Sequence, residues 1–158
     1  MQRSFDECFP YVFPFLFVTM WVVVMRVISW MGWSRFAERY GAPERPPGTA
    51  FHVLAARLGV WTSYRNALRC IPTEYGIYFY PFFLFRPWHP PFLVPWRSVV
   101  KLERRKVFFR DRIQLEIVDE AGTIHALLPL KAEGAMLDGR AGGAHLRAAG
   151  EDWAALRS

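Results

Sequence analysis

Hydrophobic positions form one long uninterrupted run near the start of the chain and shorter, spaced runs after it. Between Glu7 and Arg35 the only charged residue is Arg26, and residues 8–25 carry no charge. About 20 apolar residues in a helix span the hydrocarbon core of a bilayer. Transfer of a dozen large apolar side chains favours insertion by roughly 5 kcal/mol, whereas one arginine opposes it by at most ~3 kcal/mol. The pattern predicts an N-terminal tail and a transmembrane helix within residues 1–34.

Two other interpretations of this run, a cleaved signal peptide and a buried core helix, fit the sequence less well. A signal peptide has a basic start, a shorter apolar stretch and a small-residue cleavage site. This chain begins MQRSFDE and has no A-x-A pattern at the far end of the run. Arginines lie mostly at that far end: Arg3 precedes the run, whereas Arg26, Arg35, Arg39 and Arg45 lie in or after it. The positive-inside rule therefore predicts a single-pass protein with its N-terminus outside and residues after 34 in the cytoplasm.

Residues 35–48 connect this helix to the rest of the chain. Apolar and aromatic residues recur there at helical spacing: Trp33, Phe36, Ala37 and Tyr40. Such an amphipathic face lies either in the headgroup layer or against its own domain, and the sequence leaves both open. The run GAPERPPG over residues 41–48 then ends the helix and predicts a short, stiff linker.

Residues 49–130 change to the patterns of β-strands. Apolar and polar residues alternate over 113–117, which is typical of a half-buried strand. Turn signals at 73–76 and 120–123 separate neighbouring runs. The other apolar runs are residues 51–58, 67–71, 77–80, 92–94, 99–103 and 124–128. About seven short strands predict a mainly β domain, either a small barrel or a sandwich.

The tail, residues 131–158, is rich in glycine and alanine. Five glycines interrupt every candidate helix, each costing about 1 kcal/mol relative to alanine: Gly134, Gly139, Gly142, Gly143 and Gly150. We expect a weakly helical, partly disordered tail with at most one short helix, over 144–149 or 152–156.

Charge adds a candidate binding surface. The 158 residues include 20 Lys and Arg against 14 Asp and Glu, a net charge of +6. Residues 97–112 hold seven basic side chains: Arg97, Lys101, Arg104, Arg105, Lys106, Arg110 and Arg112. These are predicted to contact membrane lipid headgroups or phosphate, with ordinary solvated strand edges as the competing interpretation. Aromatic residues interleave poorly with this run, so no nucleic-acid partner is expected.

A second set of residues is predicted to lie at the membrane interface: Arg26, Trp30, Trp33, Arg35, Trp88 and His89. The run YPFFLFRPWHPPF over residues 80–92 is too apolar for an ordinary exposed loop. It is either a buried strand followed by a loop or a segment that dips into the bilayer surface beside the helix. His89 is expected to be a loop residue held by packing near the headgroups.

The sequence contains few features of an enzyme active site. The chain has no GxSxG, phosphate-loop, GxGxxG or HExxH motif. Its histidines are scattered, at His52, His89, His125 and His145. Cys8 and Cys70 lie far apart, which makes a disulfide framework or a zinc site unexpected. We expect a non-catalytic domain without a cofactor or a metal.

Three stretches carry a resemblance to a group of uncharacterised bacterial single-span membrane proteins. They are Gly32-Trp33-Ser34 with Ala37 and Tyr40 after the span, GIYF over 76–79, and HPPFLVPW over 89–96. The soluble part of that group is similar to small pleckstrin-homology and GRAM-type barrels. Over residues 15–130, the resemblance implies a barrel of two sheets closed by a C-terminal helix, at the bacterial inner (cytoplasmic) membrane. The glycine-rich tail departs from it, and it brings no catalytic motif or ligand.

These observations favour a tethered adaptor on the cytoplasmic face of the membrane that binds lipid headgroups or a protein partner. A second hypothesis is a structural accessory subunit of a membrane protein complex, whose helix packs against another membrane protein. A third is an enzyme with a site assembled from residues far apart in the sequence. A deep polar pocket that joins a histidine to carboxylates would favour the third.

Overall fold

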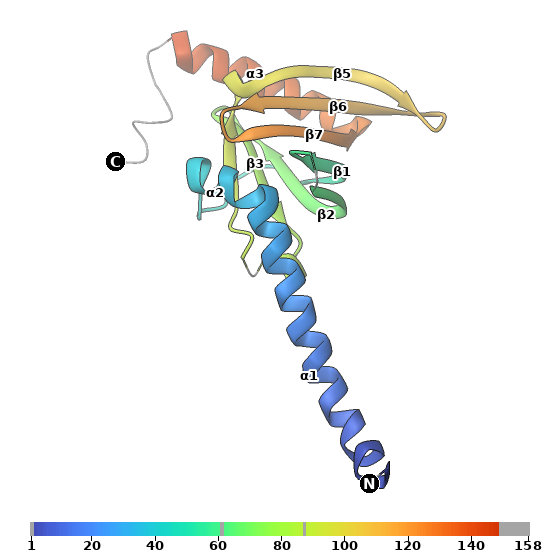
Figure 1. Ribbon diagram of the computed structural model, residues 1–158. Coiled ribbons are helices and arrows are strands. Elements are labelled where there is room, and N and C mark those ends of the chain that lie inside the picture. Colours follow the sequence, from blue (N-terminus) through green and yellow to red (C-terminus); the bar gives the residue numbers. More distant parts are fainter. Residues whose placement is uncertain (1, 61, 87, 149–158) are drawn as a thin grey trace.

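A long N-terminal helix projects from a β domain in the computed structural model, which describes residues 2–60, 62–86 and 88–148 (Figure 1). The helix comprises α1 (Gln2–Ile28), a π-helical turn (Ser29–Trp33) and α2 (Ser34–Tyr40), without a break between them. Among the described residues one helix, Tyr11–Tyr40, is long and apolar enough to cross a membrane. Its large apolar side chains from Tyr11 to Val24 are mostly exposed, because this part lies away from the domain.

The π-helical turn lies where the N-terminal helix meets the domain, and Ser29, Gly32 and Trp33 in it are buried. Ser34 donates hydrogen bonds from its backbone N–H and from its Oγ to the carbonyl oxygen of Ser29, five residues earlier. Trp33, Phe36 and Tyr40 are all buried in the domain core. Of the two predicted positions for this amphipathic face, packing against its own domain is therefore the correct one.

Seven antiparallel strands form one curled sheet, in the order β4-β3-β2-β1-β7-β6-β5. The strands are β1 (Phe51–Leu58), β2 (Thr62–Pro72), β3 (Gly76–Pro81), β4 (Phe92–Pro95), β5 (Val99–Val107), β6 (Arg110–Asp119) and β7 (Gly122–Pro129). The predicted number of strands is confirmed, and the predicted turn at 73–76 is closed by a 2.8 Å hydrogen bond from the Thr73 N–H to the Gly76 carbonyl. The fold is not a sandwich, because all seven strands belong to one sheet, and the sheet is a half-barrel because its end strands β4 and β5 do not pair with each other.

Side chains alternate between the two faces of this sheet, as strands require. One face carries the main core, which includes Phe79, Leu115 and Ile117. At the β3–β4 end the opposite face is covered by the linker after α2, where Ala42 packs with Tyr78 and other buried residues. We call this second face, away from the main core, the outer face. Over β1, β5, β6 and β7 it is largely open.

The predicted weakly helical tail is wrong for residues 133–148, which form the 16-residue helix α3 (Glu133–Ala148). Two glycines permit its close packing on the sheet. A Cβ at Gly139 would lie 2.8 Å from the Thr73 carbonyl oxygen, and one at Gly143 would lie 2.4 Å from that of Glu74. The glycines allow a close approach whose contacts outweigh their low helix propensity. The alternative helix at 152–156 lies outside the described residues.

Candidate membrane-facing surface

The N-terminal helix is held to the domain at its π-helical turn. The Ser29 hydroxyl donates a hydrogen bond to the carbonyl oxygen of Trp88, and the Trp33 Nε1–H donates one of 2.7 Å to that of Pro90. Gly32 lies against the β1–β2 turn, since a Cβ there would be 3.1 Å from the Leu58 carbonyl oxygen. The direction in which α1 leaves the domain is therefore determined by contacts with two separate loops.

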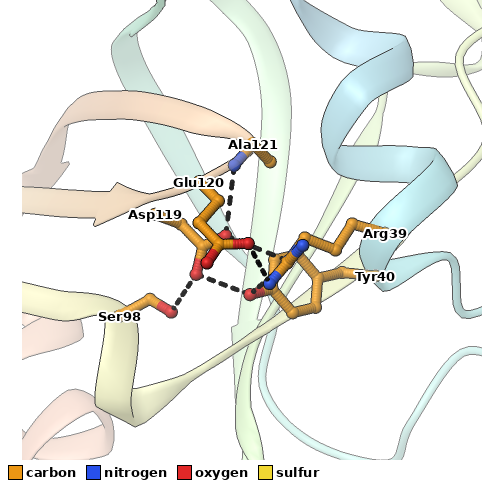
Figure 2. A network of polar contacts seen from close by, with 6 residues as sticks. All are labelled: Arg39, Tyr40, Ser98, Asp119, Glu120 and Ala121. Carbon is orange, nitrogen blue, oxygen red and sulfur yellow. Dashed lines mark hydrogen bonds and ion pairs between the residues drawn. The ribbon is translucent and has the colours of Figure 1, made fainter.

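A polar network holds the end of the helix about two turns after the π-helical turn (Figure 2). The Tyr40 hydroxyl donates a 2.6 Å hydrogen bond to Asp119, and the Ser98 hydroxyl donates one of 2.8 Å. Arg39 forms ion pairs with Asp119 at 3.2 Å and with Glu120 at 2.8 Å. Burial acts to raise the pKa of Asp119, but the hydrogen bonds and Arg39 outweigh it and the pKa is lowered. The network joins α2 to the end of β6.

His89 and Trp33, both predicted to lie at the membrane interface, point into the protein instead. Each is 0% exposed. The Tyr64 hydroxyl lies 3.1 Å from His89 Nε2, and the Trp33 and His89 rings are 5.4 Å apart. Their predicted contact with headgroups is wrong, because aromatic packing and hydrogen bonds to the loop keep both rings inside. The expectation that packing holds His89 in its loop is confirmed.

The β3–β4 loop presents aromatic side chains beside the end of the N-terminal helix. Phe83 is 68% exposed and Trp30 on the helix is 78% exposed. Other exposed apolar residues of the loop are Phe82, Leu84 and Trp88. Trp30 and Trp88 line a groove of about 530 Å³ between helix and loop, which Arg26 also borders. Figure 1 shows this loop extending from the domain in the direction taken by α1. We call these exposed side chains and Trp30 the aromatic rim.

Four of the six predicted interface residues are thus exposed at the domain end of the helix: Arg26, Trp30, Arg35 and Trp88. The first three are exposed because they lie on faces of the helix that the domain does not cover, whereas Trp88 lies in the β3–β4 loop. For the predicted run 80–92, the structure shows a buried strand followed by a loop: Tyr80 and Pro81 are buried in β3, and most of the loop residues that follow are exposed, whereas His89 is buried. Contact of this loop with the bilayer surface stays a prediction.

The basic residues predicted as one cluster divide between the two faces of the sheet. Arg104 lies opposite the core residue Ile113, and its Nε donates a 2.6 Å hydrogen bond to Glu133 on α3. Lys106 lies opposite Asp111 on the same face. Arg97 lies in the short helical turn before β5. Alternation places the remaining four on the outer face: Lys101, Arg105, Arg110 and Arg112.

The outer face gains further basic residues that the sequence analysis missed. Strand register places Ser63, Arg57, His125, Glu116 and Lys101 opposite one another across five strands: β2, β1, β7, β6 and β5. Arg65 follows two residues after Ser63 and therefore lies on the same face. Arg57 and Arg65 occupy exposed positions of strands β1 and β2. The alternation of polar and apolar residues in these strands was the signal that could have placed both arginines on the outer face. The basic outer face draws on segments up to 55 residues apart, so no local run reveals it.

A groove of about 540 Å³ crosses this basic face where the β5–β6 hairpin meets the β1–β2 hairpin. Its floor includes small side chains, among them Ala55. Charged, polar and aromatic residues line it: Arg57, Ser63, Arg105, Lys106, Phe108 and His125. Arg57 donates a 2.7 Å hydrogen bond from Nη2 to the carbonyl oxygen of Val60 in the β1–β2 turn. Among the described residues, no carboxylate lines the groove.

The tip of the β5–β6 hairpin is a two-residue turn formed by Phe108 and Phe109. Both have positive φ angles, 48° and 63°, and both side chains are 94% exposed. A turn with positive φ at both central residues ordinarily contains Asn-Gly, because bulky side chains are strained there. Val107 pairs with Arg110 on either side of the tip. Two exposed phenylalanines in a strained turn fit a role in contact rather than in folding.

Reactive chemistry is sparse in the described part of the chain. No group of three or more His, Cys, Asp or Glu residues there could hold a metal ion. Burial raises the pKa of Cys70 to about 12, so its thiol stays protonated at neutral pH. Burial also raises the pKa of Tyr64. The surfaces described above are suited to binding, because their exposed groups are aromatic rings and guanidinium groups.

No protein-family model, no curated protein and no solved structure matches the chain. The protein is a seven-stranded antiparallel half-barrel with a C-terminal helix, carried on an apolar N-terminal helix.

Proposed function

We propose that this protein is a single-span membrane protein whose β domain is held against the bilayer surface as a non-catalytic lipid- or protein-binding adaptor. One observation carries the proposal: the apolar helix continues without a break into a helical segment that is held to the domain. Its contacts are with the β3–β4 loop, the β1–β2 turn and the end of β6. An apolar helix with exposed side chains over residues 11–24 is costly in water and stable in a bilayer.

The aromatic rim supports a domain position close to the membrane. At the domain end of the helix Trp30 and Trp88 line one groove, and aromatic residues favour the interface between water and hydrocarbon. Arg26 and Arg35 lie on the same helix near this level, where their guanidinium groups reach phosphates while their stems remain apolar. By the positive-inside rule, the same arginines support a position of the domain on the cytoplasmic side. The resemblance to bacterial membrane proteins with small barrels supports the bacterial inner membrane as the location.

Spin labels in liposome-reconstituted full-length protein test this position. Cysteine at Leu84, in the aromatic rim, is compared with cysteine at Leu137, an exposed apolar position on α3. Both are introduced after Cys8 and Cys70 are replaced by alanine. Because oxygen partitions into hydrocarbon and nickel chelates do not, we expect the Leu84 label to be accessible to oxygen and protected from nickel. The Leu137 label should show the reverse. Equal nickel accessibility at both positions contradicts the proposed domain position.

A further inference from the structure

The aromatic rim leaves a second surface unexplained, the basic groove on the outer face together with the Phe108–Phe109 turn. We propose that this groove binds the phosphate headgroup of an anionic membrane lipid, with Phe108 and Phe109 entering the bilayer surface beside it. This inference rests on the proposed function, since it requires a domain held at a membrane. It adds a binding site that is distinct from the aromatic rim.

The groove has the chemistry that phosphate recognition requires. Arg57 and Arg105 enter it from different hairpins, and each carries several N–H donors in a planar fork that matches phosphate oxygens. Hydrogen bonds from Arg57 to Val60 and from Arg105 to Gln114 hold the two guanidinium groups in place. Ser63 adds a further donor. Several donor-bearing side chains that line one groove without a lining carboxylate favour a bound anion.

A membrane lipid, rather than free phosphate, is the source favoured by the surroundings of the groove. Arg57 is hydrogen bonded to the β1–β2 turn, which itself packs on the N-terminal helix at Gly32. Val60 in that turn is an exposed apolar residue. Phe108 lines the groove from the opposite hairpin, which projects to one side of the domain in Figure 1. A phosphate with apolar groups on both sides matches the boundary between headgroups and acyl chains.

The strained turn supports the same occupant. Asn-Gly at positions 108 and 109 would relieve the backbone strain, whereas Phe-Phe retains it and exposes two large apolar side chains. Basic residues flank them, namely Lys106 and Arg110. Aromatic side chains between basic ones insert into an anionic surface, because the rings partition and the cations pair with phosphate.

Native mass spectrometry of the full-length protein in neutral detergent tests the groove. Dioctanoyl phosphatidic acid is the probe, with dioctanoyl phosphatidylcholine and inorganic phosphate as comparisons. We expect Arg57→Gln with Arg105→Gln to weaken phosphatidic acid binding by at least about tenfold. Arg97→Gln with Lys131→Gln removes the same charge from exposed positions outside the groove and should change binding by less than about twofold.

Two results would overturn the proposal. Equal losses in the two double variants would show that binding follows net charge rather than the groove. Displacement of the lipid by inorganic phosphate at a similar concentration would assign the site to free phosphate. Neither result affects the spin-label measurement at Leu84, so failure of this inference is distinguishable from failure of the proposed membrane position.

The turn has its own test in the same assay. Phe108→Asn with Phe109→Gly installs residues that favour the observed turn, so we expect an unchanged or higher unfolding temperature. Binding of phosphatidic acid should nevertheless weaken by roughly three- to tenfold, because apolar contact with the lipid is lost. Weaker binding by a variant of equal or greater stability supports the phenylalanines as lipid contacts. Unchanged binding overturns that assignment.

Discussion

The Asp119 carboxylate accepts hydrogen bonds from three parts of the chain, because its negative charge attracts hydrogen-bond donors. Tyr40 from α2, Ser98 before β5 and the Ala121 N–H all donate to its carboxylate, and Arg39 lies within ion-pair distance. Its side chain is only 12% exposed. A largely buried carboxylate needs such donors, because burial without them favours its neutral form.

Replacement of Asp119 by asparagine should destabilise the domain. The amide lacks the charge that Tyr40, Ser98 and Arg39 engage, so we expect a loss of about 1–3 kcal/mol in unfolding free energy at pH 7. Asp138→Asn on the exposed side of α3 is the matched control and should change little. Chemical unfolding followed by near-ultraviolet circular dichroism measures both.

The pH dependence of this effect follows from the lowered pKa of Asp119. Because the folded state holds the proton less tightly than the unfolded chain, the contribution is present above the unfolded value, about 3.9. It is lost as pH falls through the lower folded value. The difference between wild type and Asp119→Asn should therefore shrink below about pH 4. A difference that stays constant from pH 7 to pH 3 contradicts the role of the charge.

At the scale of elements, α3 shows how packing outweighs helix propensity. Its glycines indicate a poor helix when taken singly, yet two of them lie where the helix meets the turn after β2 and the ring of Trp96. Trp96 Nε1–H in turn donates a 2.7 Å hydrogen bond to the Thr73 carbonyl. The helix is stable there because the close approach buries apolar residues such as Met136 in the core.

Two alanine substitutions in α3 should have opposite effects. Gly143→Ala places a Cβ 2.4 Å from the Glu74 carbonyl oxygen and 2.7 Å from Trp96. We expect net destabilisation, because overpacking of about 1–3 kcal/mol exceeds the gain in helix propensity. Gly134→Ala meets nothing within 4 Å and should stabilise by up to about 1 kcal/mol. Thermal unfolding measures both, and a stabilising Gly143→Ala would contradict this packing.

Strand ends show what local patterns predict at this scale. The sequence predicts β1 over 51–58, as observed, because apolar residues lie at both of its ends and at most positions between them. β2 begins at Thr62 instead of 67, and β5 extends to Val107 instead of 103. The added residues are largely polar or charged, such as Arg65 and Arg104. Pairing with neighbouring strands makes them part of the sheet, and pairing is not visible in a local pattern.

At the scale of the whole molecule, the proposed orientation is directly testable. Fluorescent protein fused after Ser158 should fluoresce in a bacterial host, and alkaline phosphatase fused there should be inactive, because arginines after the span retain the domain in the cytoplasm. A control fusion with one added leucine-rich span before the reporter should show the opposite activities. An active phosphatase without the added span contradicts the orientation.

The apolar helix and the approximate positions of seven strands can be predicted from the amino-acid sequence, because hydrophobic transfer and side-chain alternation are local properties of the chain. The folded structure places Trp33 and His89 in the interior and stabilises α3. It also divided the basic residues 97–112 between two faces and brought Arg57 beside Arg105. These features depend on strand register, on the π-helical turn and on close contact with glycine, which act between residues far apart in the sequence.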